Sequence, residues 1–229
     1  MKPKTPRVRP TINIYMDTNH DYGRSLLRGV FKYTSLHRHW MVHVDWWNLS
    51  RKKSEFPDCD GSLVAGVIPR ELQAIRQSSR HTVNCSTGDI GDDCPAVHLD
   101  NALVGELAAK HLHACNLKHF AYYPGSETKG ASGKRFEAFK NTLEKMGYPC
   151  AMAPFQWPED RQWMLQHHHK AAADWIASLP KPVGIMTFDD MVGHDLMLCC
   201  KNAGIKVPDE VAVIAVSYTH LTLPTTPYV

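Results

Sequence analysis

The sequence has 229 residues, of which 43% are hydrophobic and 21% charged, so it can bury a core and is not disordered in composition. The formal net charge of +3 is too small to indicate a nucleic-acid-binding face in this stretch. The seven cysteines form no CxxC pair, which favours free thiols in a reducing compartment. No apolar run could cross a bilayer and no export signal is recognised before Ile12, so we expect a cytoplasmic protein without membrane contact.

Apolar runs alternate with amphipathic stretches along the first half of the chain. Residues 1–10 mix four basic side chains with three prolines, and we interpret them as a flexible lead-in. Hydrophobic periodicity then predicts the other elements of this half. Strands are expected at 11–16, 41–46, 61–68, 82–85 and 96–99, and helices at 24–36, 69–77 and 101–115.

The same alternation continues in the second half, after a connection at 116–118. Strands are expected at 119–123, 150–154, 183–188 and 211–216, and helices at 134–146, 160–179 and 190–203. Strands that alternate with helices predict parallel sheets with helices on both faces. In such folds ligands bind at the carboxyl ends of the strands, so the residues that follow each strand are the candidates for a site.

Three segments carry a family resemblance in the same chain order. They are VHLDNALVGELAAKHLHACNLKHFAYYPG (Val97 to Gly125), GASGKRFEAFKNTLEKMGYP (Gly130 to Pro149) and VGIMTFDDMVGHDLMLCCKNAGIKVPDEVAVIAV (Val183 to Val216). Together they resemble the LacI/GalR-type sugar-sensing domain, over about Ile12 to Val216. The resemblance implies a two-lobed periplasmic-binding-protein-like α/β fold, with lobes at 11–116 and 117–216.

Within that superfamily the opening INIYMDTNHDYGRSLLRGVFKY (Ile12 to Tyr33) is similar to the xylose operon regulators. Ten residues before the sensor cannot hold a LacI-type helix-turn-helix, whereas xylose regulators carry an AraC-type DNA-binding domain after the sensor. Residues 217–229 show no family pattern and resemble translated adapter or out-of-frame sequence. We therefore expect a second lobe that is incomplete at its C-terminus and a DNA-binding domain that is absent from this chain.

The resemblance implies a sugar site in the second lobe that includes Arg135, Asp100 and Asp189. Arg135 matches the family's sugar-contacting arginine, and its guanidinium fork can pair with adjacent hydroxyls. From the residues alone, a surface arginine in a helix's first turn is the commoner role. Asp100 precedes a helix and is either a ligand or an N-cap. Asp189 stands where the family usually has Asn, and Asp190 is a candidate cap for the next helix.

The first lobe offers Tyr22 and Arg24, which follow the first strand and are expected at the mouth of the crevice. An ordinary loop-to-helix arginine is the alternative for Arg24. Trp46 and Trp47 are candidates for a surface that stacks on the sugar ring, although core packing is the commoner role of a strand tryptophan.

Other clusters do not predict a metal, a cofactor or a catalytic group. His167 to His169 form a run that we expect to be solvent-exposed, and Asp190 and His194 have metal-ligand spacing without a third ligand. Cys199 and Cys200 are interpreted as a buried and a half-buried thiol. Residues 130–135, GASGKR, lack the GK[ST] ending of a phosphate loop.

The sequence is thus interpreted as the sensor of a sugar-responsive transcription regulator and not as an enzyme. A pentose, with xylose expected from the resemblance, would bind between the lobes, favour closure and alter a homodimer and its DNA-binding domains. One alternative is a stand-alone sugar-binding protein for transport, which needs an export signal. The other is an α/β enzyme for a small metabolite, which needs a nucleophile or phosphate loop at a strand end.

Overall fold

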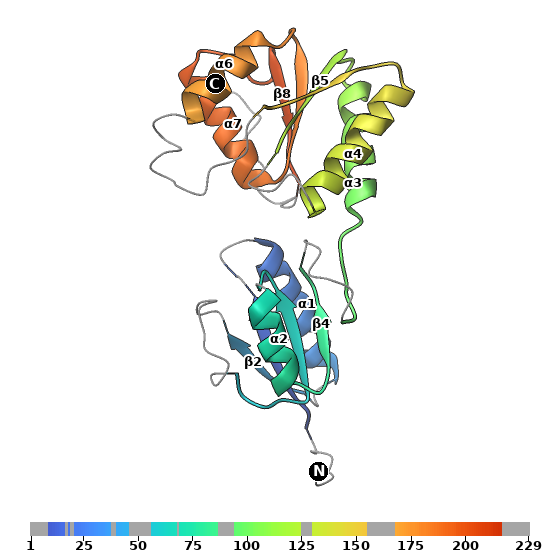
Figure 1. Ribbon diagram of the computed structural model, residues 1–229, viewed down its shortest axis with the longest axis vertical. Coiled ribbons are helices and arrows are strands. Elements are labelled where there is room, and N and C mark those ends of the chain that lie inside the picture. The colour runs from blue at the N-terminus through green and yellow to red at the C-terminus, as the bar shows by residue number, and fades with distance from the viewer. Residues whose placement is uncertain are drawn as a thin grey trace. The chain divides into compact units, whose positions relative to one another are not determined.

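The chain divides into two compact units, Met1–Leu99 and Asp100–Val229 (Figure 1). The computed structural model describes residues 9–16, 18, 21–37, 40–45, 56–67, 69–86, 94–124, 130–154 and 168–216. The division falls earlier than the boundary that we expected after residue 116. The helix at 101–114 belongs to the second unit because it packs against a helix of that unit, at 130–145.

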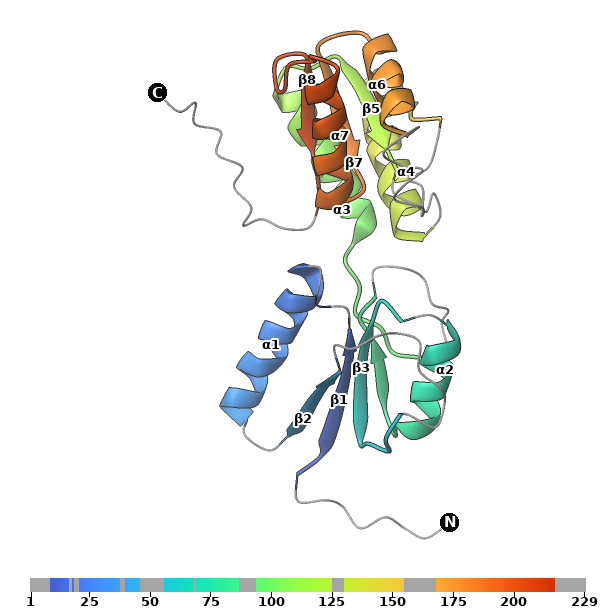
Figure 2. The same cartoon turned by 90° about the vertical axis from the view of Figure 1, so that its left-hand side faces the viewer.

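The first unit is a four-stranded parallel sheet in the order β2-β1-β3-β4. Alternate residues of β1 face opposite sides of the sheet, so Ile14 packs toward α1 and Tyr15 toward α2. The two helices accordingly cover opposite faces of the sheet (Figure 2). The elements are β1 (Thr11–Met16), α1 (Asp21–His37), β2 (Met41–Asp45), β3 (Gly61–Ala65), α2 (Pro69–Ser78) and β4 (Thr82–Asn84).

The second unit repeats this plan with a parallel sheet in the order β6-β5-β7-β8. The helices α3 and α4 cover one face, where Phe120 and Tyr122 pack, and α6 and α7 cover the other, where Ala121 and Tyr123 pack. The elements are α3 (Asn101–Ala114), β5 (His119–Tyr123), α4 (Gly130–Lys145), β6 (Cys150–Met152), α6 (His169–Ser178), β7 (Val183–Thr187), α7 (Asp190–Asn202) and β8 (Val211–Ile214).

In both sheets the chain adds its second strand on one side of the first strand and its third strand on the other side, so the connections reverse direction between two neighbouring strands. In the second unit the chain leaves β5 toward β6 and then returns across β5 to β7, so β5 and β7 are adjacent and their connections run in opposite directions. Ligands of open α/β sheets bind outside the carboxyl ends of such a strand pair. The predicted α/β class, with parallel sheets flanked by helices, is confirmed. None of the helices in the described ranges combines the length and apolarity that crossing a membrane requires.

Three predicted elements differ from the structure. The strand expected at 96–99 is wrong, because only an isolated bridge joins Ala96 to Asn84 and Val97 is 61% exposed rather than packed on a sheet. The helix expected from residue 134 begins at Gly130, so the glycine-rich stretch before Arg135 is helical and not a turn. The helix expected at 160–179 is described from His169 to Ser178, and residues 160–167 lie outside the described ranges.

Gly105 sets the closest approach of α3 to α4. A Cβ atom at this position would lie 2.3 Å from the backbone oxygen of Arg135 and 2.9 Å from the backbone nitrogen of Phe139. Backbone atoms in the middle of a helix cannot move aside as the end of a flexible side chain can. The absence of a side chain at Gly105 is therefore what lets α3 and α4 pack as they do.

We predict that Gly105→Ala destabilises the protein by about 1–3 kcal/mol, the usual cost of overpacking. Gly29 in α1 is the matched control, because a Cβ there meets nothing within 4 Å. Gly29→Ala should stabilise by about 0.5–1 kcal/mol, since alanine is the better helix former. Urea unfolding followed by circular dichroism measures both. Equal effects of the two substitutions would contradict the close helix contact.

Candidate functional site

Arg135 is a buried cation in the second unit. Its side chain extends from α4, and the residue is only 2% exposed. Its Nε donates a hydrogen bond of 2.9 Å to Oδ1 of Asn101, and its Nη1 donates to the carbonyl oxygen of Phe188. The guanidinium carbon also lies 4.8 Å from the centre of the Phe188 ring. The commoner alternative, a surface arginine in the first helical turn, is therefore wrong for Arg135.

These contacts place the guanidinium at the carboxyl end of β7. Phe188 follows β7 directly, and Asn101 is the first residue of α3. A buried charge costs several kcal/mol unless hydrogen bonds and neighbouring dipoles replace its hydration. The amide oxygen of Asn101, the carbonyl of Phe188 and the electron-rich face of the Phe188 ring provide this replacement. The site thus joins α3, α4 and the end of β7 through one side chain.

Tyr122 adds a second polar group to the same face of the sheet. Its hydroxyl donates to the backbone oxygen of Ser132 at 3.2 Å and lies 3.0 Å from the Ser132 hydroxyl. Burial raises the pKa of Tyr122 to about 12, with the Ser132 hydrogen bond and the positive charge of Arg135 opposing that rise and Asp189 adding to it. The phenol therefore keeps its proton at neutral pH and acts as a hydrogen-bonding group near a cation and a carboxylate.

Asp100 and Asp189 each cap a helix at its N-terminus. Asp100 accepts a hydrogen bond of 2.9 Å from the backbone N–H of Leu103, and Asp189 accepts one of 2.9 Å from that of Val192. The capping role that we left open for Asp100 is confirmed. Asp190, the expected cap of α7, is instead the first residue inside that helix. A contact of Asp100 or Asp189 with a sugar stays a prediction.

The two caps also flank the residues that hold the guanidinium. Asp100 directly precedes Asn101, and Asp189 directly follows Phe188. The second unit therefore brings three predicted site residues, Arg135, Asp100 and Asp189, to the ends of α3 and β7. The partners Asn101 and Phe188 were not predicted as functional residues. The signal for both is their place immediately beside the carboxylates that the sequence did point to.

Tyr22 and Arg24 lie in the first unit. The Tyr22 hydroxyl donates a hydrogen bond of 2.6 Å to the carbonyl of Cys85, which ties the start of α1 to the residue after β4. Arg24 is exposed, and its Nη1 donates to the backbone oxygen of Thr18 at 2.9 Å. Their contact with a sugar remains a prediction. Trp46 and Trp47, the candidate stacking residues, lie outside the described residues.

Two expectations for the remaining clusters are corrected. His168 is 2% exposed and not solvent-exposed, because it packs beside Tyr123, and its Nε2 lies 2.7 Å from the Tyr123 hydroxyl. Cys199 and Cys200 are both fully buried, whereas we expected one half-buried thiol. The helical periodicity of the sequence did not predict the burial of both cysteines, because α7 is covered on one side by β7 and β8 and on another by α6. His167 lies outside the described residues.

We predict that Asp189→Ala destabilises the protein by about 1 kcal/mol, because it leaves a helical N–H without its cap. Asp189→Asn should cost much less, since asparagine caps helices about as well as aspartate. Thermal unfolding of both variants, followed by circular dichroism, measures the difference. An equally large loss in Asp189→Asn would contradict the capping role and indicate that the charge itself is required.

A family model and several known proteins match the chain. Residues 109–227 match the model of the periplasmic binding protein-like domain. This range runs past Val216, the residue at which we expected the family pattern to end. The chain is 24% identical over 218 residues to the xylose operon regulatory protein of Haemophilus influenzae, which covers 92% of this chain and 56% of that protein. The xylose operon regulatory protein of Escherichia coli K12 is also 24% identical, over 93% of this chain and 56% of its own length.

Solved structures match over most of the chain. The xylose-binding transcription activator xylR has a TM-score of 0.76 at 22% identity, over 94% of this chain and 56% of that one. A periplasmic binding protein/LacI regulator from Alkaliphilus metalliredigens, complexed with D-xylulofuranose, has a TM-score of 0.67 at 16% identity, over 90% and 77%. A LacI-family regulator from Enterococcus faecium with bound ribose has a TM-score of 0.66 at 18% identity, over 90% and 76%.

These matches show how much of their length and fold the known proteins share with this chain. The chain spans about half the length of the curated relatives that it matches. The likeness to the solved structures establishes the fold, two parallel sheets of the kind described above. Since the family model covers more than half of the sequence, the chain belongs to the periplasmic binding protein-like family.

Proposed function

We propose that this chain is the ligand-sensing part of a sugar-responsive transcription regulator, and that its ligand is a pentose, with xylose the expected sugar. The observation that carries the proposal is the buried guanidinium of Arg135, held by Asn101 and Phe188 at the carboxyl end of β7. Strand ends beside a crossover reversal are where ligands of open α/β sheets bind. A guanidinium held there can donate hydrogen bonds to the hydroxyl oxygens of a neutral ligand.

The chemistry of the site supports a sugar. A guanidinium presents its N–H donors in a rigid fork that matches a pair of adjacent oxygens, and carboxylates accept hydrogen bonds from hydroxyls. Arg135 supplies the donors, and Asp100 and Asp189 at the two flanking helix starts supply the acceptors. The ring of Phe188 supplies an apolar surface at the same edge for the C–H face of a sugar.

The relatives support the regulatory part of the proposal. Two of them are xylose operon regulatory proteins by name, and two structural neighbours were solved with the pentoses D-xylulofuranose and ribose. We propose that a homodimer changes its equilibrium between two states when sugar binds one state more tightly. DNA recognition would belong to an AraC-type domain outside this chain, and a cytoplasmic location follows from that role.

Three thiols of the chain, those of Cys85, Cys150 and Cys199, lack the properties of a catalytic nucleophile. A nucleophilic cysteine needs a lowered pKa and access to solvent. Burial instead raises the pKa of Cys150 and of Cys199 to about 12, and it also raises the pKa of Cys85. These side chains are therefore protonated at neutral pH and are not the activated thiols of a cysteine enzyme.

We predict that xylose at millimolar concentration raises the unfolding temperature of the chain. A ligand at a hundred times its dissociation constant stabilises a protein by about 2.7 kcal/mol. Arg135→Lys keeps the charge but loses the fork, so the shift should fall by more than half. Fluorescence-monitored thermal unfolding with xylose, arabinose, ribose, glucose and galactose measures both the shift and its selectivity.

Lys134→Gln is the matched control for that experiment. Lys134 is the exposed neighbour of Arg135 on the same helix, and its substitution removes one positive charge without touching the buried guanidinium. The sugar-dependent shift should survive in Lys134→Gln. A chain that no sugar stabilises, or a shift that Arg135→Lys leaves intact, would overturn the assignment of the ligand or of the residue that recognises it.

A further inference from the structure

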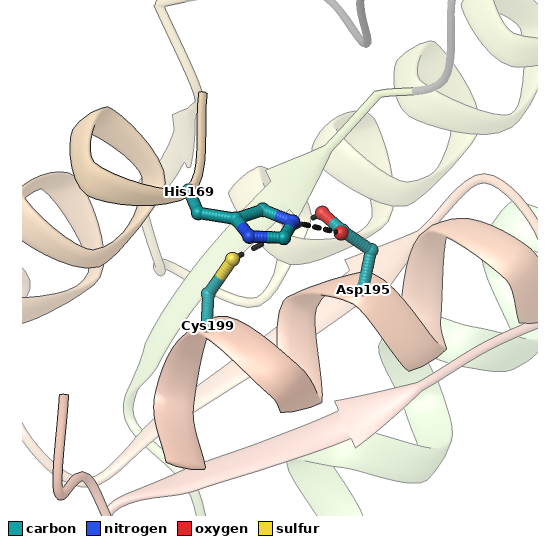
Figure 3. Close-up of side chains that lie close together, drawn as sticks. All are labelled: His169, Asp195 and Cys199. Atoms are coloured by element: carbon teal, nitrogen blue, oxygen red, sulfur yellow. Dashed lines mark hydrogen bonds and ion pairs between the residues drawn. The ribbon is translucent and has the colours of Figure 1, made fainter. Parts of the chain in front are cut away.

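A second polar cluster lies on the opposite face of the same sheet, between α6 and α7. Figure 3 shows the side chains of His169, Asp195 and Cys199 pointing toward one another, His169 from α6 and the other two from α7. The Nε2 of His169 lies 2.6 Å from Oδ1 of Asp195, and the Cys199 thiol donates to Oδ2 of Asp195 at 3.9 Å. One ligand atom from each residue lies within 4.8 Å of the others.

The cluster is enclosed by the core of the second unit. The side chains of His169 and Asp195 are 14% and 6% exposed, and Cys199 is 1% exposed. Asp195 and Cys199 are four residues apart on one helix, the spacing that puts two metal ligands on the same face. His169 approaches from the neighbouring helix. An imidazole, a carboxylate and a sulfur thus lie within 4.8 Å of one another in a place largely closed to water.

Neighbouring groups fix the carboxylate in place. The Tyr123 hydroxyl lies 2.7 Å from Nε2 of His168 and also forms a side-chain hydrogen bond with Asp195. Tyr123 therefore stands beside Asp195 as an outer hydrogen-bonding partner. Outer partners of this kind orient metal ligands and are a regular part of metal sites.

Two other roles for the cluster explain less of it. A catalytic thiol needs access to solvent, and Cys199 is only 1% exposed. A buried ion pair of His169 with Asp195 needs only two residues. Such an ion pair does not explain why the sulfur of Cys199, a weak hydrogen-bond donor, faces the Asp195 carboxylate from one helical turn away.

We propose that His169, Asp195 and Cys199 bind a zinc ion that joins α6 to α7, with water as the fourth ligand. Nitrogen, oxygen and sulfur donors together suit zinc, whose bonds to them are about 2.0–2.3 Å long. His169 Nε2 and Asp195 Oδ1, which lie 2.6 Å apart, would separate slightly to admit the ion, whereas the Cys199 sulfur, 3.9 Å from Oδ2 of Asp195, would keep a similar distance. On binding, the Cys199 thiol releases its proton to solvent and the sulfur binds as thiolate, because the charge of the ion replaces that of the proton. His169 binds through Nε2, so the hydrogen that Nε2 shares with Asp195 is released to solvent and the imidazole keeps its hydrogen on Nδ1.

This site is separate from the proposed sugar site. Arg135 and Asn101 belong to the α3 and α4 face, whereas the zinc ligands belong to the α6 and α7 face. The role that follows is structural: the ion adds a link between two helices that packing and the contact of His169 with Asp195 already bring together. The proposal stands or falls independently of sugar binding.

Cobalt(II) is the probe that tests the proposed zinc site, because a thiolate bound to cobalt gives a charge-transfer absorption band in the near ultraviolet. We expect the metal-free 229-residue chain to bind one equivalent of Co²⁺ with this band, and Zn²⁺ to displace it. Cys199→Ser should abolish the band and weaken Zn²⁺ binding by more than tenfold. His169→Gln should weaken binding likewise.

Two cysteines serve as controls. Cys200→Ser replaces the adjacent buried thiol, and Cys115→Ser removes an exposed thiol that lies 4.0 Å from Nε2 of His111 and could bind cobalt by itself. Both variants should keep the band and the affinity. A band lost in Cys115→Ser or kept in Cys199→Ser would overturn the proposal, as would the absence of any thiolate band.

The folding of each variant is measured separately. Circular dichroism of the metal-free variants checks that the substitution itself leaves the helices intact. Zinc should raise the unfolding temperature of the original chain and of Cys200→Ser, and should leave that of Cys199→Ser unchanged. An equal rise in Cys199→Ser would place the bound zinc elsewhere and overturn the site.

Discussion

The buried guanidinium of Arg135 is the interaction on which the second unit depends. A charge in the interior is tolerated only where fixed dipoles replace water, and here two segments supply them to the side chain from α4: the start of α3 and the residue that follows β7. The helices can supply them because Gly105 lets α3 lie against the backbone of Arg135. The packing of α3 on α4 and the hydrogen bonds of Arg135 therefore require the same arrangement of the two helices.

The same short segments carry stability and the proposed recognition of a ligand. In Asp100-Asn101 and Phe188-Asp189, one residue holds the guanidinium and its neighbour caps a helix. A ligand that forms hydrogen bonds with the carboxylates of Asp100 and Asp189 would bind to the groups that cap α3 and α7. We infer that ligand binding at this edge alters the stability of the helix starts and so biases the second unit as a whole.

The two faces of the second sheet have different polar centres. The α3 and α4 face holds an arginine among neutral partners and an aromatic ring, a chemistry suited to an uncharged ligand. The α6 and α7 face holds an imidazole, a carboxylate and a thiol, a chemistry suited to a cation. Adjacent residues of β5 divide between the faces, since Tyr122 belongs to the first centre and Tyr123 to the second.

Much of the fold could be predicted because its signals are local. The strand at 11–16 and the strand at 119–123 were predicted to the residue, since an apolar run between turn residues is a short-range pattern. The burial of Arg135 and His168 could not be predicted. Arg135 meets partners 34 and 53 residues away, and His168 meets one 45 residues away, so only the assembled sheet brings them together.

The most direct measurement is the NMR signal of the Arg135 Nε–H group, assigned by its loss in Arg135→Lys, during a titration with xylose. We expect one arginine Nε–H signal that exchanges slowly with solvent, because the group is buried and bonded to Asn101, and that shifts as the sugar saturates the protein. A signal that stays unchanged while xylose binds would show that Arg135 is a structural residue and that the sugar is recognised elsewhere.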